Sequence, residues 1–70
     1  MESIIVIALN GNQRQVPAGT TVAGLLDMLG IDRTRVAVER NRDVVPKKTY
    51  DLVTLHGGDH IEVVAFVGGG

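Results

Sequence analysis

The stretch of sequence that decides the fold is SIIVIAL at residues 3–9, followed at once by Asn10 and Gly11. Its many β-branched residues predict a strand. Alternation divides the side chains into two faces, with Ile5, Ile7 and Leu9 on one face and Ile4, Val6 and Ala8 on the other. Both faces are apolar, as is typical of a strand inside a sheet rather than at its edge.

The dipeptide Asn10-Gly11 predicts a tight hairpin turn after this strand. A type I′ turn needs positive φ at both central residues, and Asn followed by Gly tolerates that geometry best. The chain therefore returns as a short, more polar strand at 13–16. Pro17 ends it, because proline has no backbone N–H to donate to a neighbouring strand.

One helix is predicted next. Thr20 and Thr21 are candidate N-caps, since a threonine hydroxyl accepts a hydrogen bond from a free helix N–H. Gly30 stands where a glycine commonly ends a helix. Between them, apolar residues recur at the spacing of one helical stripe, namely Val22, Leu25, Leu26 and Leu29.

The remainder of the chain predicts three more strands. We expect strands at 35–40 and 44–46, joined by a turn at 41–43, and an irregular segment at 47–55 with a 3₁₀ turn near 51–53. A tight turn at 56–59 leads into the last strand, HIEVVAFV at 60–67. The order is β-β-α-β-β-β.

The first and last strands are the most apolar, so we expect them side by side and parallel in the centre of a mixed sheet. Four to five strands packed on one helix make an α+β fold of the β-grasp, or ubiquitin-like, architecture. We assign residues 1–67 to this domain and 68–70 to a flexible C-terminal glycine tail.

Length and composition exclude several classes of protein. Seventy residues indicate one domain, and the net charge of −1 offers no basic surface for nucleic acid. No apolar run approaches the roughly 20 residues of a membrane span. The first residues lack the basic run of a signal peptide, so we expect a cytoplasmic protein. With no cysteine, the chain has neither a thiolate metal site nor a thiol nucleophile.

The chain ends in Gly68, Gly69 and Gly70 after an apolar strand. Glycine loses the most backbone freedom in a strand and offers no side chain to pack, so these residues do not serve the fold. A narrow tail with an unhindered carboxylate suits entry into another protein's active site. A disordered end without function is the alternative, and the tail alone does not decide between them.

Short motifs along the whole chain resemble those of the ThiS family, the small sulfur carrier proteins of thiamine biosynthesis. Each motif is weak, and their order, the chain length and the glycine ending together are specific. The matching residues are LNG at 9–11, Thr21, LL at 25–26, LG at 29–30, VAVE at 36–39, Asn41, VP at 45–46, GD at 58–59, IEVV at 61–64 and FVGGG at 66–70.

The resemblance implies a carrier that is not itself an enzyme and binds no cofactor of its own. A ubiquitin-activating-type adenylyltransferase (ThiF-like) would use ATP and Mg²⁺ to convert the Gly70 carboxylate to an acyl-adenylate. A cysteine desulfurase would supply persulfide sulfur to form a thiocarboxylate. Thiazole synthase (ThiG-like) would then take the sulfur into the thiazole ring. Gly69 and Gly70 lack the Cβ atoms that would clash in a narrow active site.

A candidate partner surface lies beside the tail. If Ile61 faces the helix, Val64 and Phe66 lie on the open face of the sheet, where we expect them to form an apolar patch with Ile4 and Val6. Exposed apolar patches on small proteins often mark partner sites. The alternative is that the faces are reversed and Phe66 belongs to the core.

No catalytic or metal site is expected within the domain. His56 and His60 flank a glycine turn, so we interpret them as exposed residues rather than metal ligands. We expect Asp59 to accept hydrogen bonds from turn amides rather than act as a base. Lys47 and Lys48 are expected to be solvated.

Two other functions stay open. The small subunit of molybdopterin synthase shares the fold and the glycine ending but is usually longer. A ubiquitin-like binding module with an inert tail, or a protein modifier joined to lysines, is the other alternative.

Overall fold

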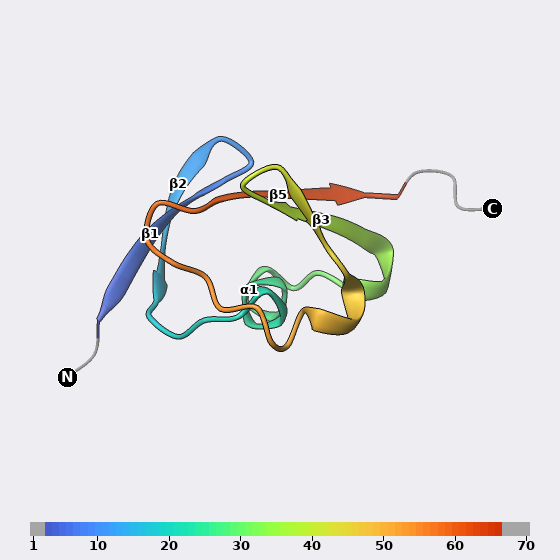
Figure 1. The fold of residues 1–70 in the computed structure, drawn as a ribbon, viewed down its shortest axis with the longest axis horizontal. Coiled ribbons are helices and arrows are strands. Elements are labelled where there is room, and N and C mark those ends of the chain that lie inside the picture. The colour runs from blue at the N-terminus through green and yellow to red at the C-terminus, as the bar shows by residue number, and fades with distance from the viewer. Residues whose placement is uncertain (1–2, 67–70) are drawn as a thin grey trace.

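A computed structural model describes residues 3–66 of the chain. The elements, in order, are β1 Ile4–Leu9, β2 Asn12–Pro17, α1 Val22–Leu29, the 3₁₀ helix η1 Arg33–Arg35, β3 Val36–Arg40, β4 Asp43–Val45, the 3₁₀ helix η2 Lys47–Thr49 and β5 His60–Ala65. The strands form one five-stranded sheet in the order β2-β1-β5-β3-β4, with α1 below it in Figure 1. This is the predicted β-grasp fold. None of the described helices is long and apolar enough to cross a membrane.

The central strand is β5, and its neighbours confirm the predicted topology. It runs parallel to β1, pairing at Ala8 with His60 and at Leu9 with Ile61. On its other side it runs antiparallel to β3, from Val36 opposite Ala65 to Arg40 opposite Ile61. The strand that leads to the C-terminus is therefore hydrogen bonded along both edges over part of its length.

Two hairpins turn through residues with positive φ. In the first, Asn10 has φ 48° and Gly11 has φ 85°, as the predicted type I′ turn requires. In the second, Asn41 has φ 52° and Arg42 has φ 73°. Arg42 lacks the conformational freedom of glycine, so this turn keeps a side chain in a region that such residues rarely adopt.

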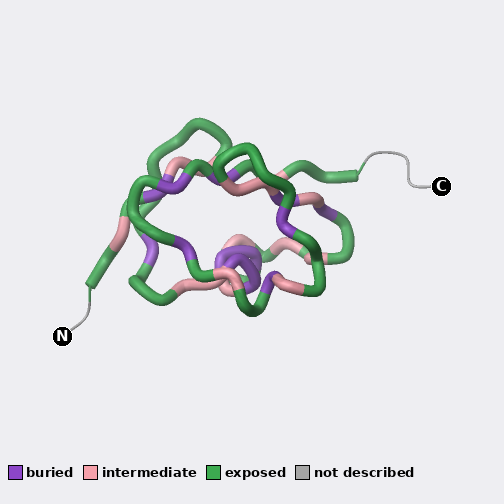
Figure 2. Tube along the Cα trace, viewed as in Figure 1, coloured by how far each residue is buried: buried purple, intermediate pink, exposed green. Residues whose placement is uncertain are grey.

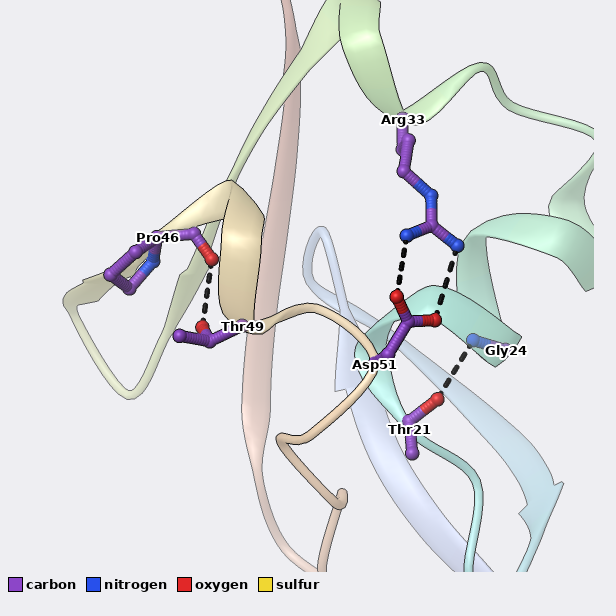
Figure 3. A network of polar contacts seen from close by, with 6 residues as sticks. All are labelled: Thr21, Gly24, Arg33, Pro46, Thr49 and Asp51. Atoms are coloured by element: carbon purple, nitrogen blue, oxygen red, sulfur yellow. Dashed lines mark hydrogen bonds and ion pairs between the residues drawn. The ribbon is translucent and has the colours of Figure 1, made fainter.

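The core lies between α1 and one face of the sheet. Thr21 caps the helix, because its Oγ1 accepts a hydrogen bond from the Gly24 N–H at 3.0 Å (Figure 3). Gly30 ends the helix with φ 69°. Figure 2 shows buried residues along α1 and along parts of the strands. The buried apolar residues are Ile7, Val16, Val22, Ala23, Leu25, Leu26, Val36, Val38, Val45, Tyr50, Leu55 and Ile61.

The 3₁₀ turn predicted near 51–53 was misplaced. The structure has one at Lys47–Thr49 instead, and another at Arg33–Arg35 that delays the third strand to Val36. Pro46 explains the first: its φ is −60°, and its carbonyl accepts hydrogen bonds from the Thr49 N–H and hydroxyl, the latter at 2.7 Å. The last strand ends at Ala65, and Val67 lies outside the described residues.

Candidate functional site

Phe66 is the last residue that the structure describes. We call Val64, near the end of β5, and Phe66, directly after β5, the tail root. The Phe66 N–H donates a hydrogen bond to the Arg35 carbonyl at 2.9 Å, which continues the pairing with the β3 side beyond Ala65. Val64 and Phe66 are 55% and 56% exposed, so Phe66 is not a core residue. The tail root thus presents two apolar side chains next to the start of the glycine sequence.

Gly68, Gly69 and Gly70 fall outside the described residues. The role assigned to the Gly70 carboxylate, and the division into a domain at 1–67 and a tail at 68–70, therefore stay predictions. The described part of the chain ends one residue after β5, at a point where β5 is paired with β3.

The structure does not bring Ile4 and Val6 together with the tail root. The strands β1 and β5 run in the same direction and pair at Ala8 with His60, so Ile4 precedes this pair by four residues and Val64 follows it by four. At about 3.3 Å per residue, eight residues of offset separate Ile4 from Val64 by roughly 25 Å. Val6 instead accepts a hydrogen bond from the Gly58 N–H at 2.8 Å.

All four residues do lie exposed, as predicted. Ile4 is 65% exposed and Val6 42%, and α1 covers the opposite face of the sheet, where Ile7 and Ile61 are buried. The predicted faces are therefore correct, and the single patch is wrong. The open face carries exposed apolar residues on β1, at Ile4 and Val6, and separately at the tail root. It also carries the exposed Val44 on β4.

Two asparagines hold β5 through their side chains. The Asn10 Oδ1 accepts from the Val63 N–H at 2.8 Å, while its Nδ2 donates to the Val63 carbonyl at 3.2 Å. The Asn41 Oδ1 accepts from the His60 N–H at 2.9 Å. The sequence interpretation recognised both as hairpin residues but not these long-range contacts. The Asn10-Gly11 dipeptide predicts positive φ at Asn10, but no local signal names the partner of either side chain.

Asp59 is the one buried charged residue of the described chain, at 6% exposure. Its Oδ2 accepts from the His56 N–H at 2.8 Å, which confirms the predicted turn contact. The sequence interpretation missed two further donors, the Arg40 Nε at 3.0 Å and the Asn41 Nδ2 at 3.1 Å. Burial alone would raise the pKa of Asp59, but these hydrogen bonds and the Arg40 charge outweigh it and lower the pKa.

This arrangement ties Asp59 to structure rather than to proton transfer. A carboxyl with a lowered pKa stays ionised, and here both of its oxygens are occupied by donors. Its contacts join the turn before β5 to the end of β3. Asp59 therefore fixes where β5 begins.

The two histidines are exposed, as predicted. Within residues 3–66, no group of three or more His, Asp or Glu side chains is placed to hold a metal ion. A groove on the open face includes His60 together with Glu39 and Glu62, which stand opposite each other on β3 and β5. Two like charges directly opposite each other are destabilising, and the cationic Arg42 lines the same groove.

Lys47 is exposed, as predicted, but its ammonium also makes two contacts that the sequence interpretation did not foresee. Its Nζ donates to the Thr34 carbonyl at 3.0 Å and lies 4.6 Å from the centroid of the Phe66 ring. A lysine therefore stands directly at the tail root.

Comparison with known proteins identifies the family. The model of the ThiS family matches residues 7–70, which include nearly all of the sheet and the glycine ending. This chain belongs to the ThiS family.

Relatives and a solved structure agree with that assignment. The chain is 38% identical over 66 residues to the sulfur carrier protein ThiS of Bacillus subtilis (strain 168), covering 93% of this chain and 100% of that one. A crystal structure of the thiamine biosynthesis protein (ThiS) from Geobacter metallireducens superposes with a TM-score of 0.82 at 30% identity, covering 94% of this chain and 100% of that one.

A longer relative is also similar. The chain is 48% identical over 64 residues to a thiazole synthase of Paramagnetospirillum magneticum (strain ATCC 700264 / AMB-1). The match covers 91% of this chain but only 20% of that protein, so the chain spans about a fifth of the length of this relative.

Proposed function

We propose that this protein is a sulfur carrier of thiamine biosynthesis, and that the carboxylate of Gly70 carries the sulfur as a thiocarboxylate. The observation that carries the proposal is the family match over residues 7–70, which joins the β-grasp domain to the glycine ending. The full-length similarity to the Bacillus carrier supports it. On this proposal the protein is a substrate of other enzymes rather than a catalyst.

The chemistry explains why activation is needed. A carboxylate is a poor acyl donor, because its oxygen is a poor leaving group. A ubiquitin-activating-type adenylyltransferase would let the Gly70 carboxylate attack the α-phosphate of ATP, with Mg²⁺ bound to the phosphates, and pyrophosphate would leave. The terminal sulfur of a persulfide, made by a cysteine desulfurase, would then attack the carbonyl carbon and expel AMP. Reduction of the resulting S–S bond by a thiol would release the thiocarboxylate.

The described residues would contribute position rather than reactivity. β5 is paired on both sides and anchored by Asn10 and Asn41, so it presents the tail root from a rigid base. Val64 and Phe66 would add an apolar contact for the enzyme that receives the tail.

Thiazole synthase is the proposed acceptor of the sulfur. A segment similar to this chain makes up about a fifth of the Paramagnetospirillum protein of that name, so a carrier-like segment and the remainder of that protein share one chain there. We infer that the separate protein described here meets a ThiG-like synthase as a partner, in the cytoplasm where ATP and thiols are available.

Mass spectrometry of the protein purified from its own cell tests the proposal. We expect the replacement of one oxygen by sulfur, localised by fragmentation to Gly70, and its absence after deletion of Gly70. Conjugates to lysine would instead indicate a modifier. An unmodified tail in thiamine-starved cells would indicate an inert binding module.

A second measurement separates two kinds of carrier. Deletion of the gene should create a thiamine requirement that the intact chain relieves. A defect in molybdenum-cofactor enzymes, with normal growth in the absence of thiamine, would identify the molybdopterin carrier instead and contradict the proposal.

A further inference from the structure

Lys47 joins three segments that are far apart in the sequence. Its ammonium donates to the Thr34 carbonyl of η1 at 3.0 Å and stands 4.6 Å from the ring centroid of Phe66 at the tail root. A lysine ammonium within about 6 Å of an aromatic centroid is attracted by the negative face of the ring. The side chain therefore connects η2 with η1 and with the end of β5.

The backbone beneath Lys47 is held on both sides. Pro46 precedes it, and the Thr49 hydroxyl donates to the Pro46 carbonyl at 2.7 Å (Figure 3). The Lys47 carbonyl accepts from the N–H of Tyr50, which is 1% exposed. Val45, two residues earlier, is also buried. The Lys47 side chain thus extends from a turn whose backbone is held in place by buried neighbours and by these hydrogen bonds.

Phe66 receives a second constraint through this contact. Its N–H is already bonded to the Arg35 carbonyl at 2.9 Å, which positions the backbone. The ring itself is 56% exposed, so packing alone does not fix its rotamer. The Lys47 ammonium supplies an attraction that favours one orientation of the ring.

We propose that Lys47 is a positioning residue that orders the Phe66 ring at the tail root before the activating enzyme binds. This inference rests on the proposed function. A binding-competent arrangement that is only partly populated weakens apparent affinity in proportion to its population, so a contact that populates it improves affinity. The contact between Lys47 and Phe66 acts on binding only. After the carrier has bound, the rate of the chemical step does not depend on this contact.

The contact is tested first without any enzyme. In the NMR spectrum of the intact protein, the ring current of Phe66 should move the ε-methylene protons of Lys47 upfield relative to those of Lys48. Lys48 is the matched control, because it is exposed and adjacent. Phe66→Leu should abolish the difference. Coincident Lys47 and Lys48 shifts in the unmodified chain would overturn the proposal.

Steady-state adenylation then tests the role. For Lys47→Met we expect a KM for the carrier that is about two- to fivefold higher, the range of an exposed cation–π contact, with kcat unchanged. Lys47→Arg keeps the cation and should restore KM, and Lys48→Met should leave it unchanged. Amide spectra confirm that each variant is folded.

The outcomes separate this inference from the function on which it rests. If the unmodified chain is adenylated and Lys47→Met has a normal KM, or Lys47→Arg fails to restore KM, the positioning role is wrong. If the unmodified chain is not adenylated by the cell's adenylyltransferase, the proposed function is wrong, while the NMR result still shows whether Lys47 orders Phe66.

Discussion

The side chain of Asn10 pairs with the backbone of Val63 as a neighbouring strand would. Its Oδ1 accepts from the Val63 N–H at 2.8 Å and its Nδ2 donates to the Val63 carbonyl at 3.2 Å. The backbone pairing of β1 with β5 ends at Leu9 and Ile61. The Asn10 side chain thus adds hydrogen bonds to β5 beyond Ile61, at Val63, in the direction of the tail root.

Two substitutions of Asn10 should separate the loss of its side-chain hydrogen bonds from strain in the hairpin turn. Asn10→Gly keeps the positive φ but removes both side-chain hydrogen bonds, and should lower the free energy of unfolding by about 1 kcal/mol. Asn10→Ala also strains the turn and should cost about 1 kcal/mol more. Urea unfolding measures both values. Hydrogen exchange at the Val63 amide should be faster in each variant, and unchanged exchange in Asn10→Gly would show that the contact is absent.

Asp59 should make stability depend on pH in the acid range. Its folded pKa lies below the ordinary value of 3.8, so its stabilising contribution is complete above that value and is lost as the pH falls through the folded pKa. Asp59→Asn leaves Arg40 without its partner and should lower the free energy of unfolding at pH 7 by about 1–3 kcal/mol.

The difference between the unmodified chain and Asp59→Asn should therefore narrow below about pH 4. Thermal unfolding between pH 7 and pH 2 measures it. Asp51→Asn is the control, because Asp51 pairs with Arg33 on the exposed surface (Figure 3) and should change stability less at pH 7. If the difference in stability between the unmodified chain and Asp59→Asn stayed constant from pH 7 to pH 2, the ionised carboxylate of Asp59 would not be what stabilises the fold.

The two apolar ends of the open face should behave differently in partner binding. Phe66→Ala should weaken binding to the adenylyltransferase by at least about fivefold, since truncation of an anchoring aromatic residue costs more than about 1 kcal/mol. Ile4→Ala should leave affinity within about twofold, because Ile4 lies at the far end of β1. Isothermal titration calorimetry compares the two, and equal losses would mean that one partner spans the whole sheet.

Gly70→Ala should slow adenylation while the fold is retained. A methyl group beside the reacting carboxylate shifts it in a narrow active site, where a misplacement of about 1 Å can cost on the order of 100-fold in rate. Pyrophosphate release measures the rate, and an unchanged unfolding midpoint shows that the domain is intact. Gly68→Ala, two residues farther from the carboxylate, should be slowed less. A normal rate for Gly70→Ala would refute the argument from narrowness.

The strands and the α-helix were predictable from local patterns, whereas the two 3₁₀ helices were not. The stripe of Val22, Leu25 and Leu26 does form the buried face of α1, and Thr21 and Gly30 do end it. The strand at 3–9 alternates as expected, with Ile7 buried and Ile4 exposed. These features depend on neighbours within a few residues, so the pattern of the chain carries them.

The partner surface was not predictable in the same way. A shift of two residues between neighbouring strands leaves every side chain on the same face, so alternation assigns Ile4 and Val64 to one face without saying how far apart they lie. That distance depends on the register between β1 and β5, which the structure shows in the pairing of Ala8 with His60. The contacts of Asp59 with Arg40 and of Lys47 with Phe66 each span 19 residues, and no local pattern reports them.

By itself, the sequence determined the order of the strands and the helix, the alternation of side chains along the first and last strands, and the glycine ending, because periodicity, caps and turn residues act locally. Tertiary structure decided which distant residues meet. It separated Ile4 from Phe66, gave Asp59 its two long-range donors, Arg40 and Asn41, and placed Lys47 over the tail root. The physical reason is that strand register and long-range side-chain contacts are settled only when β5 packs between β1 and β3 over the leucines of α1.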